Sequence, residues 1–524
     1  MWWDKLLAVS PVLVALVCLL GLRLSSARTA VAAYVLSVVV ALAVPGFRDT
    51  AVGDAGAGAV AHAIGMATAK GLLLSFIVIY VLLFGLLLYN VLREAGALDA
   101  LSRVMARSAG TPVHQALLIS AALGPFLEAT TGFGIGIVIA APLLLALGFA
   151  PERAAVLALL TQSAVPWGAL AVGTVLNAEL SGVSLRTLGV GSAWMTVPLY
   201  LLYSVVIAGV SGGWRSVWRH TPAILLVWAV LSAATWAVNA HVAVPLAGVI
   251  AGGLAAGAFL MFLLVVGKPA RSTVHETAAG TDTAGTEGGT GAALPLWRCL
   301  APYGVLVGFS LAANLWPAFS HWLSIPLVLR APSLQFELPL LTSPGFALFL
   351  ASLAGMVLFR LTGRQAWGCV CRTLMQVWPV AVSTAGFVAM STVMQRAGMI
   401  DGVSHALANW LGAGFVLVSP VLGGLGGFIT GSNSAANAMF APFQSTMAHA
   451  LHQSPALYAV VQNVAASNLT MASPSRVALA ASIAGLPGRE GTLTRRMMAL
   501  AVVVIGMVAV MAMAGSGVAA RSLR

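Results

Sequence analysis

The sequence predicts an all-α, polytopic membrane protein of about 12–14 helical spans, with two inverted repeats and broken or re-entrant helices near the bilayer midplane. Three observations predict this fold class. The chain is overwhelmingly apolar, one motif occurs twice in the same order, and breaks containing Gly or Pro interrupt the apolar runs at matching places.

Composition excludes a soluble globular protein. Of 524 residues, 60% are hydrophobic and 8% are charged, whereas soluble domains carry about 25% charged residues. Apolar runs recur from residue 6 to residue 515. So many spans are more typical of a transporter than of a receptor or an anchored enzyme.

The net charge of +12 does not indicate nucleic-acid binding. The basic residues sit in short loops between apolar runs, as Arg215 and Arg219 do, and form no continuous phosphate-binding face. This pattern follows the positive-inside rule, with anionic lipid headgroups as sufficient partners. We therefore expect a multi-pass protein of the bacterial inner membrane.

A polar stretch divides the chain into two halves. Residues 268–294 are rich in Gly, Thr and Ala and have almost no bulky apolar side chain. Such a segment cannot form a core. We expect a disordered linker over residues 268–297, between membrane halves at 1–267 and 298–524.

An internal repeat relates the two halves. REAGALDAL at 93–101 and QRAGMIDGV at 395–403 share a glycine and an aspartate at an offset of 302 (395 − 93). Further matches in the same order are LGPFLE at 123–128 with LGGFIT at 425–430, and, after a two-residue shift, Gln162-Ser163 with Gln462-Asn463. Chance similarity between Gly- and Ala-rich membrane segments is the alternative. If the repeat is a duplication, the binding site is expected where its copies meet.

Charge bias predicts that the copies have opposite orientations. The loop of the first copy carries Arg93, Arg103 and Arg107, whereas the matching loop carries only Arg396. A basic cluster at residues 360–372 precedes the second copy by one span. The first loop is therefore expected to be cytoplasmic and the second external.

The first motif whose residues could have a chemical role is GPFLEATTGFGIG at 124–136. Its glycines and proline break a helix inside an apolar region, and the freed backbone groups must face protein or a cavity. Glu128 lies in this break, where burial disfavours the charged carboxylate, so Glu128 is the candidate proton carrier. The alternative is a neutral glutamic acid that only satisfies the broken backbone. Candidate substrate-binding residues here are Thr130, Thr131, Gly132, Phe133 and Gly134.

The second motif is TGSNSAAN at 430–437. Its hydroxyl and amide groups are suited to a carboxylate with an adjacent hydroxyl. Helix packing through small residues is the alternative, although packing alone does not require two asparagines. Candidate substrate-binding residues here are Thr430, Ser432, Asn433, Ser434 and Asn437.

Two polar interruptions follow the motifs, at 161–168 and 462–476. Arg476 stands out because a guanidinium can hold a carboxylate through two hydrogen bonds, although it could equally be a loop arginine at the membrane edge. The further substrate-binding candidates are Gln162, Ser163, Gln462, Asn463, Asn468, Ser473 and Arg476. We find no catalytic, metal-binding or cofactor motif, so no enzyme activity, metal or cofactor is expected.

At these motifs the sequence resembles the L-lactate permease family. The resemblance is carried by FLE and GFG within 126–134, TGS and NAMF within 430–440, and MASP at 471–474. It implies proton-coupled uptake of lactate, glycolate or a similar 2-hydroxymonocarboxylate by a carrier with inverted repeats, and a homodimer is one expectation. Asn433 stands where the family commonly has an acid, and Thr470 where it has a lysine.

Three hypotheses remain open at this point. The first is a proton-coupled symporter of a small organic anion such as L-lactate or glycolate. The second is a carrier of another organic or inorganic anion, coupled to sodium or protons. The third is an ion channel or a membrane scaffold that transports nothing.

Overall fold

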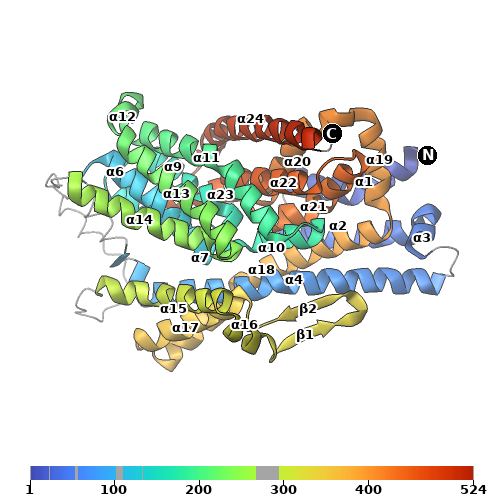
Figure 1. The fold of residues 1–524 in the computed structure, drawn as a ribbon, viewed down its shortest axis with the longest axis horizontal. Coiled ribbons are helices and arrows are strands. Elements are labelled where there is room, and N and C mark those ends of the chain that lie inside the picture. Colours follow the sequence, from blue (N-terminus) through green and yellow to red (C-terminus); the bar gives the residue numbers. More distant parts are fainter. Residues whose placement is uncertain are drawn as a thin grey trace.

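The chain folds into a bundle of long helices that lie roughly along one direction (Figure 1). The structure is a computed structural model, and it describes residues 2–22, 24–52, 57–98, 100–101, 110–132, 134–266 and 294–522. Residues 268–293 of the predicted linker lie outside these ranges, so that part of the linker stays a prediction. A helix begins at Leu296, so the last two residues of the predicted linker, 296 and 297, are helical.

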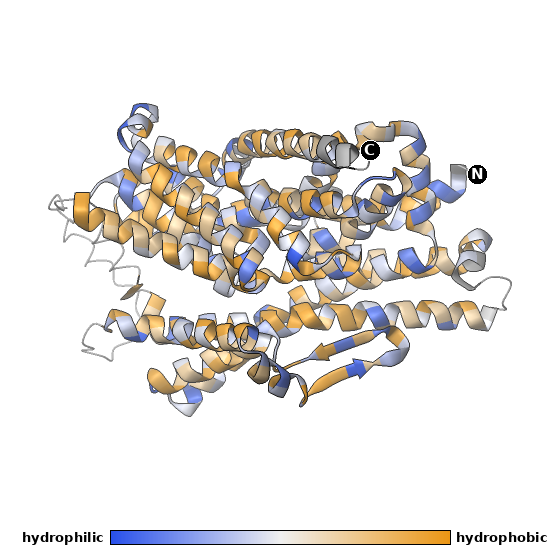
Figure 2. Ribbon diagram, viewed as in Figure 1, coloured by the Kyte–Doolittle hydropathy of each residue, from blue (hydrophilic) through white to orange (hydrophobic). Residues whose placement is uncertain are grey.

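The helical membrane fold is confirmed. In the part of the chain that the structure describes, ten helical stretches are long and apolar enough to cross a membrane: Ser26–Ala43, Gly58–Glu94, Pro151–Ser181, Leu185–Gly212, Thr221–His241, Val244–Val266, Leu296–Leu315, Gly363–Arg396, Met399–Thr430 and Glu490–Ser516. Ile135–Ala146 and Pro344–Leu358 are shorter apolar helices. Figure 2 shows that the long helices are apolar over most of their length.

The elements of the first half share one arrangement of long helices joined by short or broken ones. They are α1 (Trp2–Leu16), η1 (Val17–Gly21), α2 (Ser26–Ala43), α3 (Pro45–Val52), α4 (Ala57–Glu94), α6 (Pro112–Ala116), η2 (Leu117–Leu123), α7 (Gly124–Thr131), α8 (Ile135–Ala146), α9 (Pro151–Leu159), η3 (Leu160–Trp167), α10 (Gly168–Ser181), α11 (Leu185–Gly212), α12 (Trp214–Arg219), α13 (Thr221–His241), η4 (Val244–Leu246) and α14 (Ala247–Val266).

The second half adds a small β-hairpin to the same kinds of helix. Its elements are α15 (Leu296–Leu315), α16 (Pro317–Ser324), β1 (Val328–Ala331), η6 (Pro332–Leu334), β2 (Phe336–Pro339), α17 (Pro344–Leu358), α18 (Gly363–Arg396), α19 (Met399–Leu411), η7 (Gly412–Gly414), α20 (Phe415–Thr430), α21 (Asn433–Ala450), α22 (Pro455–Leu469), η8 (Thr470–Ala472), α23 (Pro474–Ile483) and α24 (Glu490–Ser522).

The order of elements repeats between the halves. In each half a very long helix (α4, α18) comes before a helix pair that is broken at glycine (α7–α8, α20–α21). Next comes a helix that runs into a 3₁₀ segment and restarts (α9–η3–α10, α22–η8–α23), and then another long helix (α11, α24). This repetition agrees with the internal repeat in the sequence.

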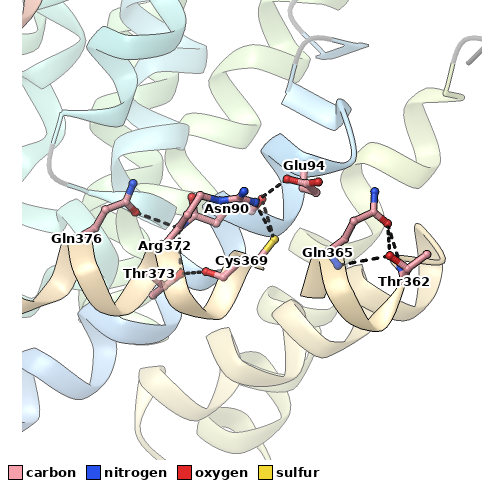
Figure 3. Close-up of polar contacts among 8 residues, drawn as sticks. All are labelled: Asn90, Glu94, Thr362, Gln365, Cys369, Arg372, Thr373 and Gln376. Atoms are coloured by element: carbon pink, nitrogen blue, oxygen red, sulfur yellow. Dashed lines mark hydrogen bonds and ion pairs between the residues drawn. The ribbon is translucent and has the colours of Figure 1, made fainter. Parts of the chain in front are cut away.

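The two long helices α4 and α18 pack side by side and run antiparallel. Near the end of α4, Asn90 Nδ2 donates to Thr373 Oγ1 at 2.9 Å and to Gln376 Oε1 at 3.0 Å. Glu94 pairs with Arg372 at 2.5 Å, and Figure 3 shows these side chains reaching toward one another across the helix pair. Because α4 ends beside the first turns of α18, these two corresponding helices point in opposite directions.

The packing of the preceding helices is reciprocal. Helix α2 of the first half packs against α18, and helix α17 of the second half packs against α4. Such an exchange is what two interlocked, oppositely oriented copies would produce. The inverted repeat itself stays a prediction.

A two-stranded hairpin departs from the all-helical expectation. Strands β1 and β2 pair antiparallel, with Arg330 opposite Glu337 and an ion pair of 3.1 Å between their side chains. Figure 1 shows the hairpin lying along the N-terminal half of α4. The sequence did not reveal it, because two four-residue strands give a weak signal between apolar helices.

Gly71 allows α4 and α18 to approach closely, and this makes a testable prediction. A methyl group at Gly71 would lie 2.7 Å from Ala389 Cα and 2.6 Å from Thr392 Oγ1. We expect Gly71→Ala to lower stability by about 1–3 kcal/mol because the helices must separate. Thermal unfolding in detergent measures this. Gly65→Ala is the matched control on the same helix, since nothing lies within 4 Å of its added methyl; equal melting temperatures for the two variants would contradict the close approach.

Candidate functional site

Two helix pairs are each broken at glycine, and the two breaks lie close together. Helix α7 ends at Thr131 and α8 begins at Ile135, with positive φ at Gly132 (67°) and Gly134 (84°). Helix α20 ends at Thr430 and α21 begins at Asn433, with positive φ at Gly431 (64°). Glycine adopts this backbone conformation at little cost, which explains why the breaks fall where they do.

Glu128 folds back over the first break. The backbone N–H of Gly134 donates to both carboxylate oxygens, at 3.3 and 3.2 Å, and Gln162 Nε2 donates to Oε2 at 3.1 Å. The side chain of Glu128 is 2% exposed. The carboxylate therefore satisfies a backbone group that the break leaves without a helical partner.

Arg476 links the two breaks. Its Nε and Nη2 donate to the backbone carbonyl of Gly431 at 3.3 and 3.2 Å. Its Nη1 packs against Gly134 so closely that a methyl group there would lie 2.0 Å away. Arg476 therefore lies between the two breaks and contacts both of them.

A strained turn forms the third wall of the site. After η3, three consecutive residues have left-handed backbone conformations, namely Ala169 (φ 39°), Leu170 (φ 55°) and Ala171 (φ 63°). For residues with a side chain this costs about 1–2 kcal/mol each. The surrounding packing must hold the turn in place, as is common at functional sites.

These elements enclose one small cavity. It has a volume of about 30 Å³, and residues of both breaks, the strained turn and the start of α21 line it: Glu128, Gly132, Val165, Gly168, Ala169, Val172, Gly173, Gly431, Ser432, Asn433, Ser434 and Arg476. The first N–H groups of α21 have no partner within their helix, and this positive end of the helix faces the cavity. Glu128 and Arg476 line the cavity together without forming a direct ion pair.

A buried amide network lies behind the cavity. Asn463 Oδ1 accepts hydrogen bonds from Asn433 Nδ2 at 3.0 Å and Asn437 Nδ2 at 3.1 Å. Asn463 Nδ2 donates to Thr174 Oγ1 and Ser192 Oγ, both at 3.0 Å. The network joins α10, α11, α21 and α22, and it fixes Asn433 at the cavity wall.

The other predicted site residues lie outside the cavity lining. Several hydroxyls bond to the backbone of their own helix: Thr130 to Phe126 and Leu127, Thr131 to Leu127, and Thr430 to Gly426. Ser473 caps α23, Gln462 donates to Ala436 O, Asn468 accepts from Tyr203, and Ser163 is buried. Phe133 lies outside the described residues.

Several site residues were missed from the sequence. The strained turn was missed because Ala169, Leu170 and Ala171 carry no glycine or proline signal. Thr174 of the amide network was missed too, and so was Asn177, whose Nδ2 donates to Asn437 Oδ1 at 3.3 Å, although two polar residues three apart inside an apolar run could have indicated them. No group of three or more His, Cys, Asp or Glu residues that could hold a metal occurs among the described residues.

Comparison with known proteins identifies relatives along most of the chain. The family model described as L-lactate permease matches residues 4–326 and 323–518. The L-lactate permease of Streptococcus iniae is 26% identical, covering 72% of this chain and 79% of its own. The glycolate permease GlcA and the L-lactate permease of Escherichia coli strain K12 are 24% and 25% identical, each covering 79% of this chain and 80% of its own.

One solved structure shows a weaker similarity. The Alcanivorax borkumensis YdaH transporter is 17% identical, covers 82% of this chain and 84% of its own, and has a TM-score of 0.45. A similarity at this level does not define the fold.

The amide network makes a prediction about stability. Asn463→Leu keeps a similar volume but removes the acceptor and donor at the centre of the network, so we expect a loss of about 2 kcal/mol or more. Thermal unfolding and the yield of monodisperse protein in detergent measure it. Asn314→Leu is the control, because Asn314 donates to Ser310 O within its own helix. A loss no larger than the control's would show that the network does not support the site.

Proposed function

We infer that this chain, which belongs to the L-lactate permease family, imports a small 2-hydroxymonocarboxylate such as L-lactate or glycolate together with a proton. It is a multi-pass integral protein of the bacterial inner membrane. The proposal rests on one observation: Glu128, Arg476 and the N-terminal end of α21 line the same cavity. The permease names of its relatives suggest the class of substrate.

The cavity offers two kinds of attraction for a carboxylate. The guanidinium of Arg476 can hold a carboxylate in a planar, two-bond arrangement. The N–H groups at the start of α21 add the positive end of a helix dipole. Asn433 and Ser434 on the same wall are the proposed partners of the 2-hydroxyl group.

Proton coupling follows from the charge on Glu128. An anion that enters a small, poorly hydrated cavity beside an ionised carboxylate is repelled, and the repulsion is strong at low dielectric. A proton on Glu128 removes it, so proton and anion bind more favourably together than separately. This reciprocal coupling is the physical basis of symport.

The cavity must widen during transport. A volume of about 30 Å³ has room for two or three water molecules, whereas lactate has six heavy atoms. Repeats that rock against one another, as in carriers with inverted repeats, are the proposed means of opening it.

Glu128→Gln tests the coupling. In proteoliposomes with wild-type protein, an inward proton gradient should raise uptake of labelled L-lactate or glycolate; in the variant, uptake should be indifferent to the gradient while exchange of internal for external substrate continues. Glu337→Gln, on the exposed hairpin, is the matched control. Gradient-driven accumulation by Glu128→Gln would exclude Glu128 as the proton carrier, and a response to sodium instead would favour the alternative coupling ion.

Arg476→Gln tests carboxylate binding. Loss of a charge-assisted, two-bond contact worth about 1.5–3 kcal/mol should raise the KM for lactate or glycolate about 10- to 100-fold. The KM of Arg476→Lys should lie between those of Arg476→Gln and wild type, because lysine keeps the charge without the planar geometry. Arg364→Gln controls for the lost charge, and a panel that adds propionate and dicarboxylates measures substrate choice. An unchanged KM would remove Arg476 from the binding site.

A further inference from the structure

A second, much larger cavity lies near the site and contains none of its residues. Its volume is about 1140 Å³, and its walls come from the first half of α4, the end of α18, the end of α10 and the tip of the hairpin. We call this cavity the vestibule. Four ionisable residues line it: His62, Lys70, Glu179 and Arg396.

Three charged side chains of the vestibule do not contribute ion pairs to the described part of the fold. Within the described part of the chain, Lys70, Glu179 and Arg396 form no ion pair and no side-chain hydrogen bond, and all three side chains are exposed to the vestibule. Lys70 and Glu179 also lie inside helices that are apolar enough to cross the membrane. Ionisable residues in such positions are costly and are usually functional.

One helix connects the vestibule with the site. On α10, Val172 and Gly173 line the small cavity, whereas Glu179 and Leu180 line the vestibule. The six residues from Gly173 to Glu179 rise about 9 Å along a helix. The vestibule therefore reaches to within about two helical turns of the proposed substrate site.

The position of the vestibule indicates the side from which it fills. It lies at the start of α4 and the end of α18, whereas Arg93, Arg364 and Arg372 lie at the opposite end of this antiparallel pair. By the positive-inside rule the arginine-rich end is cytoplasmic. The vestibule then opens toward the external side.

We propose that the vestibule is an external collecting chamber for small organic anions, in which Lys70 and Arg396 raise the local anion concentration before the site opens. This inference rests on the proposed function for the identity of the anion. Among the described residues that line the vestibule, two cations outweigh one acid, Glu179, and a cleft with low-dielectric walls focuses their field. Attraction of this kind acts on the rate of entry and is screened by salt.

The transport experiment measures initial uptake of labelled glycolate or lactate as a function of ionic strength. For wild type, kcat/KM should fall as an inert salt is added. The double variant Lys70→Gln with Arg396→Gln should lose about three- to tenfold in kcat/KM at low salt, with kcat unchanged and little remaining salt dependence. Glu179→Gln should raise kcat/KM at low salt. Arg364→Gln, at the other end of α18, should change neither kcat/KM nor its salt dependence.

A labelling experiment tests the vestibule without transport. Ser333, at the tip of the hairpin, is exposed and lines the vestibule. In Ser333→Cys protein, the introduced thiol should react faster with an anionic methanethiosulfonate than with a cationic one of similar size, after subtraction of the parent's rate. The double variant should reduce or reverse that preference.

The two readings separate failure of this inference from failure of the proposed function. If the double variant keeps both the reagent preference and the salt dependence of wild type, the collecting chamber is overturned. If wild type transports no hydroxy acid but shows the charge-dependent labelling, the proposed substrate is wrong and the chamber for anions stands.

Discussion

The structure depends on the need to satisfy backbone polar groups where two helices break inside the membrane. Hydrocarbon offers no hydrogen bonds, so each freed N–H or C=O must find a partner within the protein. At the first break the Gly134 N–H donates to the Glu128 carboxylate. At the second, the Gly431 carbonyl accepts from Arg476. The groups that satisfy the breaks are thus the charged groups that face the cavity.

Glu128 and Arg476 form no direct ion pair with each other. Glu128 accepts from the Gly134 N–H and from Gln162 Nε2, and Arg476 donates to the Gly431 carbonyl. Under the proposed function, a carboxylate that approaches Arg476 would compete with the Gly431 carbonyl, and a proton on Glu128 would weaken the hydrogen bond from the Gly134 N–H. The proposed ligand binding would then be linked to the geometry of the breaks through the same few hydrogen bonds. The amide network behind them is fixed from several sides, because Asn463 bonds to four side chains on three other helices.

The sequence predicts the helical membrane fold and several residues that line the small cavity, for clear physical reasons. Glycines and an acid inside apolar runs indicate a break whatever the tertiary structure, so Glu128, Gly132 and Asn433 could be found. Hydroxyls are different, because a threonine in a helix can bond to its own backbone; Thr131 and Thr430 do so, and composition cannot distinguish this from a side chain that faces a cavity.

Other features depend on tertiary contacts alone. Ala169 and its neighbours adopt left-handed conformations only because the surrounding helices hold them there, against local preference. Lys70 and Glu179 lie 109 residues apart (179 − 70), each as a single charge in an apolar run. Their shared cavity follows from the packing of α4, α10 and α18, which no local pattern in the sequence records.

The two cavities differ in size by more than an order of magnitude, and α10 separates them. The strained turn lies at the end of α10 that faces the small cavity, and the exposed Glu179 lies at the other end. Gly173 of α10 approaches Asn433 so closely that a methyl group there would lie 2.6 Å from Nδ2. A small shift of α10 therefore changes the width of the site and its separation from the vestibule together. The same helix carries Thr174, which accepts a hydrogen bond from Asn463, so the amide network and the packing around the strained turn both hold this wall in place.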